Sequence, residues 1–541
     1  MAEGRDRQED APLLRQRSVR RLQQAGSDAA VLRRNPRPRR QGVAVPAQEQ
    51  GRRQGARQTA DPLILHRIET DTKNAAGDEL LRRFSVDPVS PQTEKRMSRD
   101  AFIAANRFGL GARPGELSAL AGDPRGALLE QLKATPVPTD LPDTAGALEI
   151  AGSRRAMTAG TTMDANDDGR PDNPIRDLYL REVTARFARC VASTAPLRDR
   201  LVLFWSNHFT VSVARSGVVP LAGVFEREAI APHVTGRFAD LLTAATLHPA
   251  MLTYLDQYRS IGPDSKIGQR KDVGLNENLG REVLELHTLG VDGGYGQDDV
   301  IALARILTGW TATTDKGGVA KRFGFDPNRH QPGDKMLVGT KIKEGGEQET
   351  HDALAMLARH PSTAKHLATK LVRHFVADDP PAAAVDHIAS VYLQSDGDLA
   401  AVTRAVIALD SAWTDPLAKM KTPWELAVAM ARALGGDGLM VDGPALFRRL
   451  RSLGQPPFGA PSPAGWPDRA PDWLGPDALM RRIDLGADIA GKQAGGTDLA
   501  SLIDATIAPL LSPSKAQFIK GAGDRASGVA MVFASPEFQQ R

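Results

Sequence analysis

Apolar residues recur three and four positions apart along almost the whole chain after residue 97, and this helical period is what most constrains the fold. Between Pro114 and Phe209 it predicts two short helices broken at Gly122–Pro124 and two long ones separated near Pro196. Later helices are expected at 350–359, 362–376, 381–395, 398–411, 422–435, 443–453 and 476–491, with a last pair near 498–511 and 526–538. Strand-like alternation occurs in KRFGFDP and KMLVGTKI. We therefore predict a mainly α fold, a single large helical domain over 97–541 with a small β-hairpin inserted near 319–344.

The first 96 residues differ in charge from the rest of the chain. They carry 20 Lys and Arg against 13 Asp and Glu, whereas the remaining residues carry 49 against 52. This segment has no sustained apolar period and is rich in Arg and Gln, which predicts a disordered basic leader over 1–96. An RNA- or membrane-binding tail is the alternative. A third interpretation is that Met97 is the true start, because the helical domain opens directly after it.

Composition also bears on location and partners. The leader lacks the apolar stretch of about 7–15 residues that a secretory signal needs, and no run approaches the ~20 apolar residues of a membrane span. The single Cys190 excludes an internal disulfide and is expected to pack inside a helix. The slightly acidic folded part disfavours nucleic acid. We expect a cytoplasmic protein, with export as the alternative.

The run from Asn276 to Trp310 predicts a site. At about 100° per residue, four apolar residues share one narrow arc of a helix: Leu279, Val283, Leu286 and Leu289. Polar side chains border this arc, with Asn278, Glu282 and Glu285 on one flank and Asn276 and His287 on the other. Polar groups beside buried surface tend to have shifted pKa values, which favours function. The alternative is a set of surface ion pairs from Arg281 to Glu277 or Glu285.

The helix NENLGREVLELHTLGVDGGY is accompanied by FWSNHF at Phe204–Phe209, FGFDPNRH at Phe323–His330, HPSTAKHLATKLVRHF at His360–Phe375 and a Pro-rich tryptophan loop at Gly465–Trp473. With these motifs the chain, from about residue 98 to 541, resembles the bacterial domain-of-unknown-function family 1800. The resemblance implies a mostly helical bacterial protein, often exported in relatives and often encoded near sulfatase-like proteins. It implies no particular reaction.

An insertion at 164–177 has the ligand spacing of a calcium loop. Its candidate ligands are Asp164, Asn166, Asp168, Arg170 through its carbonyl, Asp172 and Asp177. Ile175 stands where such loops carry a bidentate Glu. We predict a structural calcium ion there; the alternative is a surface loop stabilised by its own Asp and Asn side chains.

The remaining candidates are scattered along the chain. His208 ends a helix, and Asp326, His330 and Lys335 lie beside the predicted hairpin. Histidines with a carboxylate suit a catalytic transition metal, although no HExxH-type pair fixes one. The Pro- and Gly-rich loop at 454–475 carries Trp466 and Trp473, which are expected either to line a cleft or to cover the core.

From these residues the sequence favours a hydrolase acting on a polysaccharide or other envelope polymer. Glu282 is its expected acid/base, Asp326 its second carboxylate, and His287 and His208 its supporting groups. The expected substrate-binding residues are Asn207, Asn278, Arg281, His330, Lys335, Trp466 and Trp473. The alternative is a non-enzymatic helical scaffold or accessory partner of a sulfatase-like protein. An enzyme requires the catalytic side chains to converge, whereas a scaffold would spread them apart.

Overall fold

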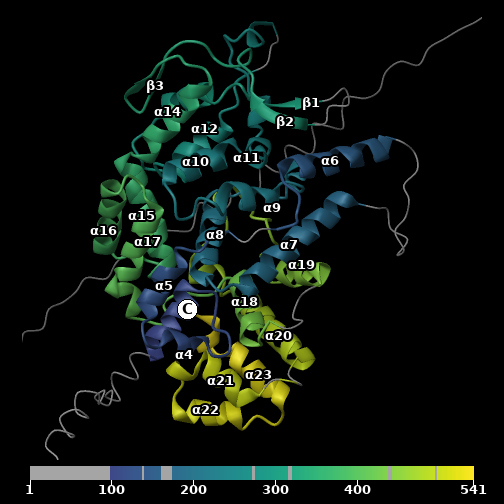
Figure 1. Ribbon diagram of the computed structural model, residues 1–541, viewed down its shortest axis with the longest axis vertical. Coiled ribbons are helices and arrows are strands. Elements are labelled where there is room, and N and C mark those ends of the chain that lie inside the picture. The colour runs from purple at the N-terminus through teal and green to yellow at the C-terminus, as the bar shows by residue number, and fades with distance from the viewer. Residues whose placement is uncertain are drawn as a thin grey trace, which may run out of the picture. The chain divides into compact units, whose positions relative to one another are not determined.

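The computed structural model describes residues 98–136, 139–159, 173–270, 274–314, 320–436, 442–493, 496 and 498–541 (Figure 1). These residues belong to one compact unit. The unit is made mainly of helices, which confirms the predicted fold class. The basic leader lies outside the described residues. Within the part of the chain that the structure describes, no helix has the length and apolar character needed to cross a membrane.

The first group of helices confirms the predicted breaks. It comprises α4 (Glu116–Leu120), α5 (Pro124–Gln131), α6 (Thr144–Ala159), α7 (Pro174–Ala192) and α8 (Pro196–His208). Asp123 caps α5 by accepting a hydrogen bond from the Gly126 amide, and Pro124 occupies the first helical position, where no backbone donor is needed. Cys190 is buried in α7, as expected of a packing residue.

The next group is interrupted by π-helical turns. It comprises α9 (Ala222–Phe225), α10 (Phe238–Leu247), α11 (Pro249–Tyr254), α12 (Asn278–Glu282) and α13 (Gln297–Ile306). A π-helical turn, Val283–His287, continues α12. Its wider winding changes which side chains face inward: Leu284 is fully buried, whereas Leu286, expected in the apolar stripe, is only half-buried.

Two small antiparallel sheets replace the single predicted hairpin. β1 (Trp310–Thr314) pairs with β2 (Ala320–Phe325), and β3 (Lys335–Leu337) pairs with β4 (Thr340–Ile342). KRFGFDP and KMLVGTKI therefore do form strands but not with each other. β2 pairs with a strand directly after α13, and KMLVGTKI closes on itself.

The helices after residue 346 follow the predicted ones within a few residues. They are α14 (Glu347–Ala358), α15 (Pro361–Phe375), α16 (Ala382–Gln394), α17 (Leu399–Ala408), α18 (Pro423–Ala433), α19 (Gly443–Ser452), α20 (Pro476–Gln493), α21 (Leu499–Thr506), α22 (Pro513–Lys520), α23 (Arg525–Ala534) and α24 (Pro536–Gln539). The sequence analysis missed α22 and joined α23 to α24 across Ser535.

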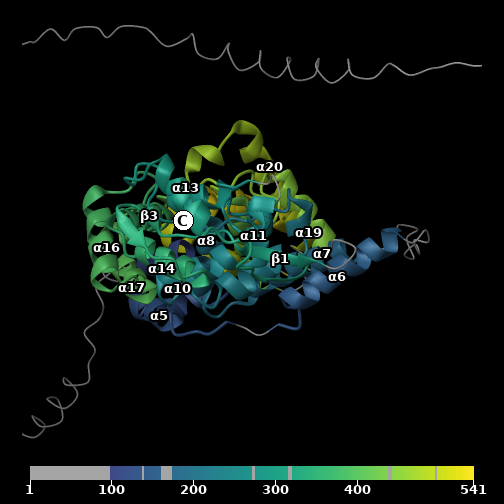
Figure 2. The same ribbon diagram turned by 90° about the horizontal axis from the view of Figure 1, so that it is seen from above.

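Two hydrophobic clusters form the core, and α8 lies between the helices that contribute to them. α15, α16 and α17 contribute to the first cluster, whereas α7, α18 and α20 contribute to the second. In both Figure 1 and Figure 2, α8 lies between the side of α16 and α17 and the side of α19 and α20. This central position makes the end of α8 the natural place for a site shared by distant segments.

Candidate functional site

A cavity of about 370 Å³ lies beside the C-terminal half of α8. Side chains of α8, α15, the start of α18 and the loop at 455–472 line it. Three predicted site residues are among them: Asn207, His208 and Trp466. The volume is that of a small-ligand pocket.

One face of α15 supplies His366, Lys370 and His374, four residues apart, so that their side chains lie in a row. The row packs against α8. The ring centroids of His366 and His208 are 6.2 Å apart, and those of His374 and Phe204 are 5.2 Å apart. The two helices thus place Lys370 at the cavity wall, between two imidazoles of its own helix.

Backbone carbonyls determine which ring nitrogen carries the proton in His208 and His366. Nε2 of His208 donates to the carbonyl of His287 at 3.1 Å, and Nε2 of His366 donates to the carbonyl of Leu286 at 3.0 Å. A carbonyl oxygen only accepts, so each neutral ring carries its proton on Nε2 and a lone pair on Nδ1. Burial and the nearby Lys370 lower the pKa of His208 well below its usual range and that of His366 to about 4. Among the described residues, Nδ1 of His208 has no hydrogen-bond partner.

His287 lies at the end of the π-helical turn and is fully buried. Its ring centroid is 6.1 Å from that of His208, and burial lowers its pKa to about 3. Neither ring nitrogen finds a partner in the described part of the chain. A buried polar group left unsatisfied costs roughly 1–3 kcal/mol, and such groups call for a functional explanation. The structure therefore brings the predicted His208 and His287 together.

Lys370 is the most unusual group of the cavity wall. Its side chain is partly buried, and no described residue accepts a hydrogen bond or forms an ion pair with its amine. Burial, followed by the like charge of Arg373, lowers the pKa of Lys370 to about 8, although Asp468 opposes the shift. Near neutral pH the amine is mostly charged, but a measurable fraction is the free base.

Glu226, a carboxylate of the cavity wall, is already bound by cations. It pairs with Arg186 at 2.6 Å and with Arg189 at 2.9 Å, and Ser206 donates to it at 2.8 Å. Burial alone would raise the pKa of Glu226, but the two guanidinium groups outweigh it and lower the pKa to about 2. Glu226 is therefore ionised at neutral pH and is not a proton donor.

Asp468 is held in the same way. It accepts a hydrogen bond from Nδ1 of His374 at 2.8 Å and lies 3.5 Å from the amine of Lys419. Burial would raise the pKa of Asp468, but His374 and Lys419 outweigh it and hold the pKa well below its usual range. This bond also fixes the orientation of His374.

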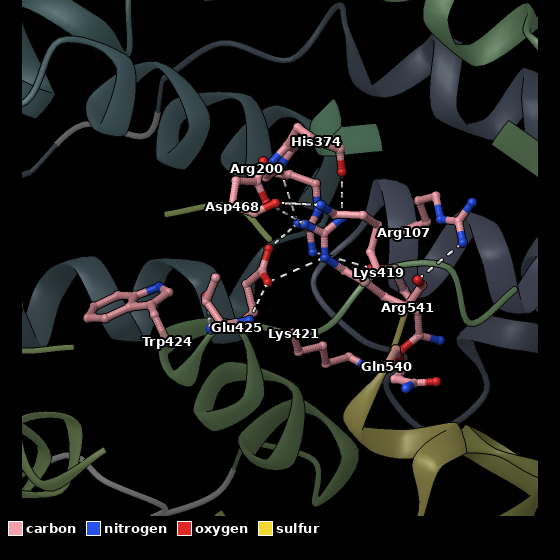
Figure 3. A network of polar contacts seen from close by, with 12 residues as sticks. Arg107, Arg200, His374, Lys419, Lys421, Trp424, Glu425, Asp468, Gln540 and Arg541 are labelled. Carbon is pink, nitrogen blue, oxygen red and sulfur yellow. Dashed lines mark hydrogen bonds and ion pairs between the residues drawn. The ribbon is translucent and has the colours of Figure 1, made fainter. Parts of the chain in front are cut away.

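A buried network of cations adjoins the cavity (Figure 3). Glu425, which lines the cavity, receives hydrogen bonds from Arg200 and, at 3.3 Å, from Arg541. Other cations here are satisfied by backbone carbonyls. Lys421 donates to the carbonyls of Phe538 and Gln540, both at 2.6 Å. These carbonyls satisfy the donors of Lys421 without a counter-charge, and burial lowers the pKa of this amine well below its usual range.

The tryptophan loop is fastened to α8 by Asn207. The Asn207 side chain donates to the Trp466 carbonyl at 2.9 Å and accepts from the Trp466 amide at 2.7 Å. Gly465 has φ +83°, and a Cβ there would lie 2.4 Å from the backbone oxygen of Asn207, so glycine is required. Trp466 lines the cavity, whereas Trp473 is buried, with ring centroids 6.1 Å apart. Trp466 thus fits the interpretation that the loop lines a cleft, and Trp473 fits the interpretation that it covers the core.

Glu282, the expected acid/base, does not line this cavity. It is half-exposed, and burial followed by the charge of Glu285 raises its pKa, against the effect of Arg281. Arg281 pairs with Glu277 at 3.0 Å, which is the ion pair considered as the alternative from sequence. Asn278 is exposed at the start of α12.

Asp326, His330 and Lys335 also lie outside the cavity wall. Asp326 accepts from the Asn328 amide within its own turn. His330 and Lys335 converge on the fully buried Glu349, at 2.9 Å and 2.6 Å. They form a buried ion cluster that links β3 to α14.

The sequence analysis missed Lys370, His374 and Asp468. The first two had a signal, the spacing of His366, Lys370 and His374 in HPSTAKHLATKLVRHF. Asp468 had none, because its partner His374 is 94 residues away in the chain.

Metal sites receive little support from the described residues. The calcium-type ligands from Asp164 to Asp172 lie outside them, and Asp177 is exposed in the first turn of α7. Elsewhere in the described ranges, no group of three or more His, Cys, Asp or Glu side chains is arranged to hold a metal ion.

Comparison with curated proteins and with solved structures gave no match. A family model described as protein of unknown function, DUF1800, matches residues 103–540. Because this match covers most of the chain, the protein belongs to the DUF1800 family.

Proposed function

We propose that this protein is a hydrolase that cleaves an ester-type bond in a polysaccharide or other envelope polymer, and that its active site is the cavity between α8 and α15. One observation carries the proposal. The amine of Lys370 and Nδ1 of His208 both lack partners among the described residues, and both side chains line the same cavity. Hydrolysis requires a base and a cation that can both act on one bound substrate, and two groups on the wall of one cavity supply them.

The two groups take complementary roles. In the hydrolytic step the ring of His208 turns so that Nδ1, which is buried from solvent in the structure, accepts a proton from water as the water oxygen attacks the electrophilic centre of the ester. The ammonium form of Lys370 stabilises the negative charge that develops on the oxygen. The leaving hydroxyl then takes the proton back from His208, so that water is consumed and an acid and an alcohol are released.

A glycosidase using two carboxylates is disfavoured in this cavity. Such an enzyme needs one carboxylic acid that is protonated at working pH. Of the four carboxylates on the wall, Glu226, Glu425 and Asp468 are held ionised by cations, and Asp472 is exposed to solvent. Glu282 has a raised pKa but lies outside the cavity, so the proposal gives to His208 and Lys370 the role that the sequence assigned to Glu282.

The size and lining of the cavity support a polymer repeat as the substrate. A volume of about 370 Å³ accommodates one small group rather than a long segment of chain. Trp466 adds an aromatic ring, and such rings stack well on the apolar face of a sugar.

The test is a hydrolysis assay on O-acylated, phosphorylated, sulfated and underivatised polysaccharides, followed by chromatography of the released acid. The wild type should release acid from at least one derivative, and both H208Q and K370M should lose that activity. K365M is the matched control, because Lys365 lies on the same helix but is exposed and paired with Asp386. If E282Q abolished turnover while K370M retained it, the active site would lie at Glu282 instead.

A non-enzymatic accessory role remains the second candidate, favoured by one observation. Leu474, Leu479 and Met480 are large apolar side chains exposed close together in sequence after the tryptophan loop. Exposed apolar groups of this kind are typical of protein contacts. Co-elution with a purified sulfatase-like protein, lost in a variant with all three changed to serine, would favour this role. Hydrolysis with no co-elution would exclude it.

A further inference from the structure

We infer that the substrate carries a compact oxyanion, a phosphate, sulfate or carboxylate group, and that Lys370 and Arg373 bind it. The inference deepens the proposed function and rests on it for the identity of the site. It depends on how charge is distributed between the cavity wall and the interior next to it.

The interior around α8 and α18 is rich in cations. Seven Lys and Arg side chains are no more than 1% exposed: Arg107, Arg200, Lys419, Lys421, Arg432, Arg482 and Arg541. Four of the seven pair with carboxylates: Arg200 and Arg541 with Glu425, Lys419 with Asp378, and Arg432 with Glu116. Arg107 instead donates to the backbone carbonyls of Ala412 and Asp415. A guanidinium bound to neutral acceptors keeps its charge, so Arg107 adds a positive field to this interior.

Two buried carboxylates of the wall are already bound by other cations. Glu226 is bound by Arg186 and Arg189, and Asp468 by His374 and Lys419. Asp468 also attracts Lys370 and raises its pKa, but no described residue accepts a hydrogen bond from the amine of Lys370 or forms an ion pair with it.

Arg373 supplies the second free cation. It lies three residues after Lys370 on α15, so that both side chains share one face of the helix and line the cavity. In the described structure its one hydrogen bond is from Nε to the Asp378 carbonyl, at 3.3 Å. Its two terminal nitrogens can donate together to an oxyanion, the geometry that guanidinium groups favour.

A neutral ligand would leave the charge of the Lys370 amine uncompensated, and a cation would be repelled by both side chains. An oxyanion gives both of them a partner. Binding should therefore raise the pKa of Lys370, because a neighbouring negative charge stabilises the ammonium form.

The experiment titrates the full chain with sodium phosphate, sodium sulfate and sodium acetate by calorimetry, at ionic strength held constant with sodium chloride. The wild type should show saturable binding of at least one oxyanion, and the tightest of the three identifies the group. K370M should weaken that binding about tenfold or more, the loss expected for a charge-assisted hydrogen bond. K365M should bind as the wild type does. Lysine side-chain NMR should show the pKa of Lys370 rising as the anion is added.

Three outcomes would overturn the inference: no saturable binding of any of the three anions, unchanged binding in K370M, or equal losses in K370M and K365M. If K370M does not fold, R373M takes its place and should show a comparable loss. The inference and the proposed function fail separately. Lys370-dependent anion binding without hydrolysis of any polymer would refute the proposed hydrolase activity. Equal hydrolysis of charged and uncharged polymers would refute the inference that the substrate carries an oxyanion.

Discussion

Replacing Lys370 with Met is expected to stabilise the protein while removing anion binding. The wild-type folded state must keep an ammonium group partly buried and without a partner, whereas the unfolded chain exposes that group to water. Methionine fills a similar volume without a charge. A gain in stability with a loss of binding is the pattern expected of a side chain retained for function.

The size of the gain follows from the pKa of Lys370, which falls from 10.5 to about 8 on folding. At neutral pH this difference corresponds to a penalty of about 3 kcal/mol in the free energy of unfolding, as an order of magnitude. The folded pKa is the lower of the two, so the penalty is fully present below pH 8 and disappears as the pH rises towards 10.5. The advantage of K370M should therefore be large at neutral pH and small in alkali.

Urea denaturation of wild type and K370M, at about pH 7 and about pH 10, measures this difference directly. K365M serves as the control and should change stability by less than about 0.5 kcal/mol, because Lys365 and Asp386 form an exposed ion pair. A less stable K370M at neutral pH would refute the reasoning, because the amine would then have a partner. A stability gain of equal size at both pH values would also refute the reasoning, because the gain would then not depend on the titration of the Lys370 amine.

Three further predictions concern other parts of the molecule. E349Q leaves the amine of Lys335 buried without a counter-charge and should destabilise the fold by about 3–5 kcal/mol in urea. In the wild type this contribution of Glu349 is present above pH 4.5 and should be lost as the pH falls towards about 2, which circular dichroism can follow. G465A should cost more than about 1 kcal/mol and expose Trp466 to fluorescence quenchers, because of the positive φ and the contact with the Asn207 backbone. Cys190 should resist iodoacetamide in the native protein and react after denaturation, since burial raises its pKa to about 11.

The helices were predictable because their signals are local. α15 was expected at 362–376 and spans Pro361–Phe375, where a proline begins the helix and apolar residues recur on one face. The π-helical turn at Val283–His287 was not predictable from an angle of about 100° per residue. It buried Leu284 where Leu286 had been expected.

The candidate site depends on contacts between distant segments, which no local pattern encodes. Sequence singled out His208 and His287, and the fold brings them together across 79 residues. It also singled out Glu282 and Asp326 as catalytic carboxylates, but neither side chain lines the cavity. Asp326 instead accepts a hydrogen bond within its own turn. Lys370 was overlooked because a lysine on an amphipathic helix is usually solvated.

The paired hydrogen bonds between Asn207 and Trp466 have a kinetic consequence. They attach the tryptophan loop to the end of α8 at both the amide and the carbonyl of one residue, so the aromatic wall is in place before any ligand arrives. A preformed wall spares the ligand the entropy of ordering a loop on binding. Association should then follow a single exponential whose rate rises linearly with ligand concentration, and turnover should not be limited by the opening of a lid.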